Sequence, residues 1–399
     1  MQRSSSTTTK PPRGISGSAA PGTDPAAAAA ALAADEQLAA MRTATLAERR
    51  GPRFRLNLRG IAGQIGGALA VIFCVLTVTF VVTRIFAPDP TSLFLGAAGN
   101  GFGSPEAQAE ARAQVAENLG LDGSILHQYL TFLGQAVQGD FGTSFQTGRP
   151  VTQDLLDRLP ATLELAMYSL IIGVGVGILF GVLAAVWHES WFDRVSRFFA
   201  IGFMAMPQFW IGLMLLWIFY TELHLAPGPV GRLPVNTPPP PDWTGFFVID
   251  SVITGNWETA RAAISQLVLP VITFGLALAA PVYKVVRTSM LESLTSDYVR
   301  SAKALGFGQR RIAMRYALKN GLLPVVTILA SVIGFTLAGS ILIEGIFGWP
   351  GVGNYSLRAI QTSDFPAIQA FVVYCAVIYV LIYEGLNAAY AFLDPRVRS

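Results

Sequence analysis

Few residues of this chain have the types and the spacing that catalysis or metal binding would require. The three histidines, His127, His188 and His224, lie far apart in the sequence and do not have the spacing of metal ligands. A phosphate-binding loop needs a lysine directly after a glycine, and no lysine of the chain has that neighbour. No motif places a serine, a histidine and an acid, or two carboxylates, together. The sequence therefore predicts no metal site and no hydrolysis of ATP by this chain, and an intramembrane enzyme is the least supported hypothesis.

Acidic residues inside apolar segments are the remaining candidates for chemistry. Glu344 and Glu384 lie at or within the ends of long apolar runs, where ionisable side chains often mark a proton relay or a substrate path. Glu344 is expected at the outer boundary of the membrane, where hydration is easy, so a role in packing is the alternative for both. Cys74 and Cys375 also fall within apolar runs, and we expect free thiols rather than a disulfide.

The elements that must position these side chains are membrane-spanning helices. The chain has a mean hydropathy of +0.49 and only 13% charged residues, about half of the roughly 25% typical of soluble domains. Six apolar runs reach the ~20 residues that a helix needs to cross a bilayer. They cover residues 61–86, 161–187, 195–223, 265–286, 322–343 and 367–392. The sequence therefore predicts an all-α polytopic membrane protein with six transmembrane helices, and its net charge of +3 gives no indication of nucleic-acid binding.

Basic residues indicate how the helices are oriented. Lysine and arginine are concentrated before the first run, between the second and third, between the fourth and fifth, and after the last. By the positive-inside rule these segments face the cytoplasm, and so do both termini, including residues 394–399. Residues 1–60 then form a cytoplasmic extension that is rich in small and polar residues at its start and is expected to be largely disordered, apart from an alanine-rich helical stretch.

Two segments are expected on the outer side. Residues 87–160 should contain an amphipathic helix over 104–118 and a second helix from Ser124 to Val137, followed by the turn-rich sequence GDFGTSFQTGRP. The second outer segment, 224–264, contains PGPVGRLPVNTPPPPD, which is too rich in proline for a helix and predicts an irregular loop. Within the third run, Met206-Pro207 predicts a distorted helix.

The inner segment 288–321 has two helical patterns separated by glycines. Leu291, Leu294, Tyr298, Ala302 and Leu305 recur at spacings of three and four, which predicts one apolar stripe. After Gly306 and Gly308 a second pattern begins at Ile312. Two short helices joined by a glycine turn would form a rigid knob at the membrane face. The alternative is a helix pair that lies on the lipid headgroups, with its arginines facing anionic lipid.

The residues of this segment resemble those of a known family. Tyr298-Val299, Ala302, Ala304, Gly306, Asn320 and Leu322-Leu323-Pro324 match the EAA-type loop of ATP-binding-cassette importer permeases, in the form of the dipeptide, oligopeptide and nickel branch. Arg300 stands where the family's older motif has an acidic residue, a departure shared by much of this branch.

Four more stretches extend the resemblance over residues 61–399. They are Arg158-Leu159-Pro160-Ala161-Thr162-Leu163-Glu164-Leu165-Ala166, the turn GDFGTS at 139–144, Phe347-Gly348-Trp349-Pro350-Gly351-Val352-Gly353 with Asp364-Phe365-Pro366 and Gln369, and the ending Leu393-Asp394-Pro395-Arg396. The first 60 residues have no counterpart in the family pattern.

The resemblance implies a fold and two candidate sites. The fold is a MetI-like permease core of five helices, residues 161–393, preceded by an extra first span, 61–86. The loop 288–321 is implied to be the coupling helix that docks on an ATPase subunit through Tyr298, Val299, Ala302, Ala304, Leu305, Gly306, Arg310 and Arg311. Candidates for the pore or the outer gate are Met206, Pro207, Phe347, Trp349, Pro350, Gly351 and Asp364. For Trp349 an interfacial aromatic anchor is the alternative.

The implied function is that of one permease subunit of an importer, most simply for peptides, in the inner membrane of a bacterium. Its partners would be a second homologous permease, two ATPase subunits, an extracytoplasmic substrate-binding protein and membrane lipid, with ATP and magnesium bound by the ATPases and no cofactor on this chain. Nickel or another small solute is an alternative cargo. An ion-coupled secondary transporter, which needs no ATPase, is the alternative of a different class.

Overall fold

The computed structural model describes residues 58–86, 110 and 124–393. These residues are helical with irregular connections and contain no β-strand, only a bridge between Thr143 and Pro150. The N-terminal extension, the helix expected over 104–118 and the ending Asp394-Pro395-Arg396 lie outside the described residues. Contacts divide the chain into two units, Met1–Ala62 and Gly63–Ser399, and the architecture described here belongs to the second.

Four helices are each long and apolar enough to cross a membrane. They are α2 (Leu58–Phe86), α6 (Val151–Val186), α10 (Trp257–Thr295) and α16 (Phe365–Leu393). Two bent pairs would also qualify, the first made of α7 (Trp191–Ala205), α8 (Gln208–Leu216) and the π-helix η1 (Trp217–Glu222), and the second of residues 309–321 with the start of α14 (Leu323–Ile346). The described residues therefore hold four candidate spans, or six if each bent pair is one span.

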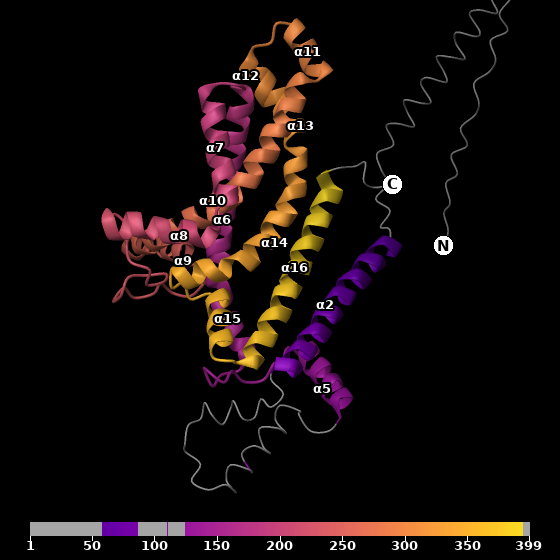
Figure 1. Ribbon diagram of the computed structural model, residues 1–399, viewed down its shortest axis with the longest axis vertical. Helices are drawn as coiled ribbons and strands as arrows, with labels where there is room; N and C mark the ends of the chain where they lie inside the picture. The colour runs from indigo at the N-terminus through magenta and orange to yellow at the C-terminus, as the bar shows by residue number, and fades with distance from the viewer. Residues whose placement is uncertain (1–57, 87–109, 111–123, 394–399) are drawn as a thin grey trace, which may run out of the picture. The chain divides into compact units, whose positions relative to one another are not determined.

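The distortion expected at Pro207 is confirmed, and it is a full break in the helix. Met206 leaves the helical region, with φ −88° and ψ 136°, as expected for a residue before proline. The axes of the two halves differ by 107°, so that α8 runs across the direction of α7 (Figure 1). The apolar run 195–223 is therefore not one straight helix.

The centre of the fold is the close packing of α6 on α10. Gly173 and Gly181 of α6 lie so near to α10 that an added Cβ would be 2.8 Å from the Gly275 carbonyl oxygen and 2.8 Å from the Val286 Cβ. This approach buries a core that includes Leu165, Phe274, Leu278 and Val282. Glycine on the contact face is typical of helices that pack closely in membranes.

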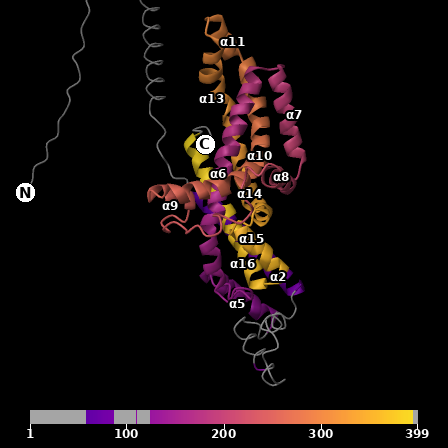
Figure 2. The same cartoon turned by 90° about the vertical axis from the view of Figure 1, so that its left-hand side faces the viewer.

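The helix expected from Ser124 to Val137 is confirmed as α5 (Ile125–Gln138). Ser124 caps its start by accepting a hydrogen bond from the His127 N–H, and Gly139 ends it with φ +73°. Tyr129 of α5 packs on Phe80 of α2, with ring centroids 5.2 Å apart. Near the same C-terminal end of α2, Gln369 of α16 donates a 2.6 Å hydrogen bond to Thr83. α5 and α16 therefore both contact α2 (Figure 1 and Figure 2).

Two shorter helices, α9 (Phe247–Ile253) and α15 (Val352–Gln361), lie between the longer ones in the sequence. α9 follows the proline-rich segment, which is irregular up to Phe246 as expected. The irregular loop expected to continue to residue 264 is wrong there, because no proline follows Phe246 in this segment and α9 and the start of α10 are helical. α15 lies between α14 and α16 and follows the Trp349-Pro350-Gly351 turn. α15 and the segment after α10 lie at opposite ends of the bundle (Figure 1).

Candidate functional site

The segment 288–321 forms a folded helical hairpin at one end of the bundle. α10 continues to Thr295, and the chain then forms α11 (Asp297–Ala304), α12 (Gln309–Arg311), the π-helix η2 (Ile312–Ala317) and α13 (Leu318–Gly321). Figure 1 shows α11 and α12 beyond the ends of the long helices. Two short helices joined by a glycine turn were predicted here, and both are confirmed.

This hairpin has a small core of its own. Val299, Ala302 and Ile312 are buried against one another, at 0%, 3% and 2% exposure. Phe307 and Tyr316 stack over this core with ring centroids 5.7 Å apart, and the Arg311 guanidinium lies 4.6 Å from the Phe307 ring. The hairpin is therefore held together by packing between its two arms.

Gly306 makes the turn between the two arms. Its φ is +81°, and its N–H donates a 2.9 Å hydrogen bond to the Lys303 carbonyl. The next N–H, of Phe307, donates to the Ala302 carbonyl at 3.3 Å, which closes the end of α11 as glycine commonly does. Gly308 has an ordinary φ of −66°, so of the two glycines only Gly306 is required by the backbone.

The candidate coupling residues do not all lie on one surface. Val299 and Ala302 point into the hairpin core. The others are exposed, namely Tyr298, Ala304, Leu305, Gly306, Arg310 and Arg311. The single apolar stripe expected from Leu291 to Leu305 is wrong, because Ser296 leaves the helix with ψ 156° and resets the helical phase. As a result Leu305 is 75% exposed.

Tyr298 and Asn320 are brought together although they are far apart in the motif. Partial burial acts to raise the pKa of Tyr298, but side-chain hydrogen bonds with Asn320, Ser296 and Ser293 outweigh it and leave the pKa below its ordinary value. The Tyr298 ring is 40% exposed. Tyr298 therefore lies near Asn320 of α13 and is also exposed at the surface of the hairpin.

At the other end of the bundle, the Trp349-Pro350-Gly351 turn is bonded to the start of α6. Trp349 is 1% exposed, and its Nε1 donates a 2.8 Å hydrogen bond to the Ala161 carbonyl. The Val352 N–H donates to Thr162 Oγ1 at 2.8 Å. The interfacial anchor considered for Trp349 is therefore wrong, because its indole ring does not reach the surface of this chain.

Glu344 lies at the centre of this contact. It is fully buried, and its carboxylate accepts hydrogen bonds from Thr162 Oγ1 at 2.8 Å and from the Asn354 N–H at 2.9 Å. Gly351 passes so close that an added Cβ would overlap Glu344 and Thr162. The easy hydration expected for Glu344 is therefore wrong, since protein groups replace water around it.

A buried ion pair joins the proline-rich segment to α6. Arg232 binds Glu164 of α6 through Nη2 at 2.6 Å and Nε at 3.1 Å, and the exposed fractions of the two side chains are 9% and 1%. The guanidinium also lies 3.5 Å from the Phe247 ring centroid and donates to the Gly245 carbonyl. Burial lowers the pKa of Arg232 from its ordinary value, and Glu164 acts against this shift.

Asp364 joins the turn at 139–150 to the last helix. It is fully buried, accepts a 2.5 Å hydrogen bond from Ser144 Oγ, and caps α16 by accepting from the Ala367 N–H at 3.4 Å. Nearby, Asp154 forms ion pairs with Arg149 at 3.1 Å and with Arg158 at 3.0 Å. The motif residues before α6 and before α16 therefore form one continuous contact region.

The gate candidates separate into two groups. Phe347, Trp349, Gly351 and Asp364 are buried in the contacts between α6, α14 and α15 or at the start of α16, whereas Met206, Pro207 and Pro350 are exposed. A place on a substrate path stays a prediction for all seven. Arg232 was not singled out from the sequence, because a lone arginine 68 residues from Glu164 in an irregular loop carries no periodic or motif signal.

Comparison with known proteins identifies the family. Residues 177–399 match the model of the binding-protein-dependent transport system inner membrane component, and residues 57–166 match that of the N-terminal part of such membrane components. The chain belongs to this permease family. The motif residues that lie at the two ends of the bundle are therefore those of a transport component. The MetI-like permease fold is confirmed.

Several relatives cover most of this permease. A probable D,D-dipeptide transport system permease of Escherichia coli K12 is 36% identical over 331 residues, 83% of this chain and 95% of that protein. A dipeptide transport system permease of Alkalihalophilus pseudofirmus is 36% identical over 332 residues, 83% of this chain and 96% of the relative. A glutathione transport system permease of Escherichia coli O1:K1 is 31% identical over 341 residues, 86% of this chain and 99% of its own.

Proposed function

We propose that this chain is a permease subunit of an ATP-binding-cassette importer that takes up di- and oligopeptides across the bacterial inner membrane, with both termini in the cytoplasm. The observation that carries the proposal is the folded hairpin at 288–321 in a chain of the binding-protein-dependent transport family. The dipeptide and glutathione systems among the relatives support a peptide cargo.

The hairpin is the part that would meet an ATPase subunit. Its internal core keeps the two arms together, so a force on the exposed ring of Tyr298 or on Leu305 moves α11 as one body. α11 follows α10 after a single residue, and α10 packs along α6. Closure of two ATPases would therefore move the central helix pair of the permease, which is a rigid-body mechanism.

The outer end has a different task in this proposal. The turn at 139–150 is bonded to Asp364, directly before α16. The Trp349-Pro350-Gly351 turn is bonded to Ala161 of α6, and Arg232 of the proline-rich segment forms its buried ion pair with Glu164 of α6. Such a firmly held surface is suited to receive an extracytoplasmic binding protein. A second permease subunit would complete the path, and ATP and magnesium would be bound by the ATPases rather than by this chain.

Two variants test the hairpin, and a substitution at the second glycine is their control. Gly306→Val places a β-branched residue at φ +81°, which costs about 1–2 kcal/mol and distorts the turn. Leu305→Asp changes the exposed surface without touching the hairpin core. In vesicles containing the whole complex, both variants should reduce dipeptide taken up per ATP hydrolysed several-fold, while the permease still inserts.

Gly308→Ala is the matched control, because Gly308 has an ordinary φ and no atom within 4 Å of an added Cβ. It should couple as the unchanged protein does. Normal uptake per ATP in both Gly306→Val and Leu305→Asp would exclude docking through this hairpin. ATP-independent uptake by the isolated chain would instead support the ion-coupled transporter, and uptake of nickel but not of peptide would change the cargo alone.

A further inference from the structure

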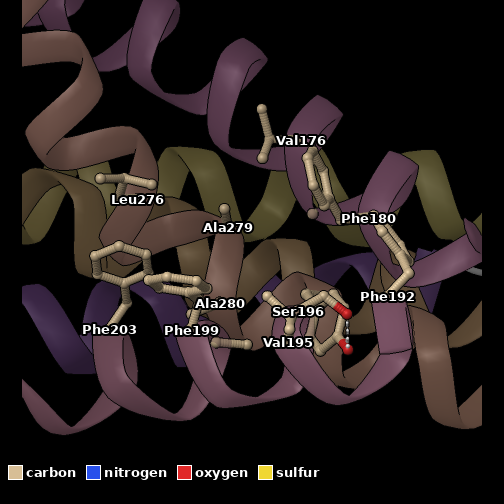
Figure 3. A pocket seen from close by; sticks show the side chains of 13 residues that line it. Val176, Phe180, Phe192, Val195, Ser196, Phe199, Phe203, Leu276, Ala279 and Ala280 are labelled. Atoms are coloured by element: carbon tan, nitrogen blue, oxygen red, sulfur yellow. Dashed lines mark hydrogen bonds between the residues drawn. The ribbon is translucent and has the colours of Figure 1, made fainter. Parts of the chain in front are cut away.

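An apolar groove of about 370 Å³ runs between α6, α7 and α10. Figure 3 shows its walls, formed largely by the rings of Phe180, Phe192, Phe199 and Phe203. Phe180 stacks on Phe192 and Phe199 on Phe203, with centroids 5.8 Å and 6.2 Å apart. Small residues, among them Ala279, complete the lining and leave room for a narrow occupant.

The groove offers almost nothing to a polar ligand. The hydroxyl groups of Ser196 and Tyr283 are 3.0 Å apart and hydrogen-bond to each other, as the dashed line in Figure 3 shows. A peptide in this groove would leave its backbone N–H and C=O groups without partners, which is costly in an apolar site. The chemistry of the lining therefore selects a hydrocarbon chain.

A basic pocket of about 500 Å³ adjoins this groove and shares Ala200 and Tyr283 with it. Arg197, Lys284 and Arg287 all line this second pocket. The buried carboxylate of Asp193 binds Arg287 at 2.7 Å and Arg197 at 3.1 Å, so it neutralises one of the three charges. Lys284 is exposed and has no ion pair with any residue in the described part of the chain.

The two pockets together fit one kind of molecule. Excess positive charge within membrane-spanning helices is costly unless an anion compensates it, and basic pockets between such helices bind the phosphates of anionic lipids. We propose that an anionic phospholipid binds here, with its phosphate at Arg197 and Lys284 and an acyl chain in the aromatic groove. In the orientation of the proposed function this lipid belongs to the inner leaflet, and that placement is the one part of the proposal that rests on the proposed function.

The experiment measures lipid retained by the purified complex. The complex is placed in nanodiscs of phosphatidylcholine and phosphatidylglycerol, and native mass spectrometry then counts the lipid that stays bound. The unchanged protein should retain phosphatidylglycerol in preference to phosphatidylcholine. The double variant R197Q/K284Q should bind phosphatidylglycerol roughly 30-fold more weakly, from about fivefold for each basic residue.

Two further variants separate charge from shape. R194Q removes the same charge from the same helix, but Arg194 donates to the Glu189 carbonyl at 3.1 Å and lines neither pocket, so retention should not change. A200W fills the wall shared by both pockets and should expel the lipid while leaving all three basic residues in place. In R197Q/K284Q the pair between Arg287 and Asp193 remains, which keeps α7 on α10.

Three results would overturn the lipid site. They are normal phosphatidylglycerol retention by R197Q/K284Q, equal retention of the two lipids by the unchanged protein, and a photo-crosslinker at position 199 that captures the second permease subunit instead of lipid. If the chain purifies without ATPases, the same measurement is made on the chain itself. Failure of the proposed function and failure of the lipid site are therefore separate outcomes.

Discussion

Glu164 and Glu344 both hold a buried carboxylate at the end of the bundle opposite the hairpin, and different groups compensate each one. Arg232 forms an ion pair with Glu164, whereas Glu344 receives hydrogen bonds from Thr162 and from the Asn354 N–H. Removing one member of such a buried pair leaves an uncompensated charge, and its cost exceeds the net value of the pair. At the scale of single residues the end of the bundle opposite the hairpin is therefore most sensitive to loss of a partner.

Arg232→Ala should destabilise the permease by about 3–5 kcal/mol, because Glu164 is then left buried without a cation. The proline-rich segment should also become open to proteases, since Arg232 binds both α6 and the Gly245 carbonyl. Thermal unfolding of the purified complex and limited proteolysis measure the two effects. Arg261→Ala, at an exposed position early in α10, is the control and should change neither. An unchanged unfolding temperature in Arg232→Ala would show that the ion pair contributes nothing to stability.

Sequence reasoning at this scale found the motifs but not their contacts. Thr162, Trp349 and Asp364 were each recognised from local sequence, yet nothing local indicates that the Trp349 indole bonds to the Ala161 carbonyl. Trp349 and its partner Ala161 are 188 residues apart in the sequence, and Thr162 and its partner Glu344 are 182 residues apart. Burial follows from such contacts, and for this reason the expected hydration of Glu344 was wrong.

At the scale of helices, the packing of α6 on α10 depends on glycines at particular positions. Gly173 faces α10, and an added Cβ would lie 2.8 Å from the Gly275 carbonyl oxygen and 2.9 Å from the Leu278 Cβ. Gly175, two residues later, has no atom within 4 Å of the same added carbon. The two positions share a helix and differ in what they face.

Gly173→Ala should therefore destabilise the permease by about 1–3 kcal/mol through overpacking. Gly175→Ala should leave stability unchanged or raise it by about 0.5–1 kcal/mol, because alanine favours the helix. Thermal unfolding of the purified complex distinguishes the pair. Equal effects at the two positions would mean that α6 does not pack on α10 in the assembled permease.

Helix boundaries could be predicted only in part. Ser124 and Gly139 define α5 almost to the residue. By contrast α10 extends from Trp257 to Thr295, well beyond the apolar run 265–286, and the cap at its start, where Asn256 accepts from the Thr259 N–H, was missed. Neither a proline nor a glycine marks the helix break at Ser296 in the sequence. The spacing of apolar residues therefore predicts one unbroken apolar stripe, which the structure does not have.

For the whole molecule, the family match covers nearly all of the chain except its beginning. The two family models match residues 57–166 and 177–399. Relatives aligned over 95–99% of their own length cover 83–86% of this chain. The transport core is therefore expected to assemble without the extension.

Deleting residues 1–50 should leave assembly with the partner subunits and peptide uptake largely unchanged. Co-purification of the ATPases and the second permease measures assembly, and uptake in vesicles measures transport. A shortened chain that no longer holds its partners would show that the extension is a real contact. Deletion of residues 288–321 is the opposite control, and it should abolish coupling because it removes the hairpin.

The hydrogen bond between Thr83 and Gln369 also has a consequence for biosynthesis. It joins the first long helix to the last across 286 residues of sequence. At a translation rate of roughly 5–20 residues per second, α2 must wait about 15–60 s in the membrane before α16 emerges to pair with it. During that interval α2 lacks α16 as a neighbour, and among the described residues the Thr83 hydroxyl then bonds only to the Thr79 and Phe80 carbonyls of its own helix. It is then that a holding factor of the insertion machinery would be needed. A nascent chain that stops before α16 is therefore the form most exposed to quality control.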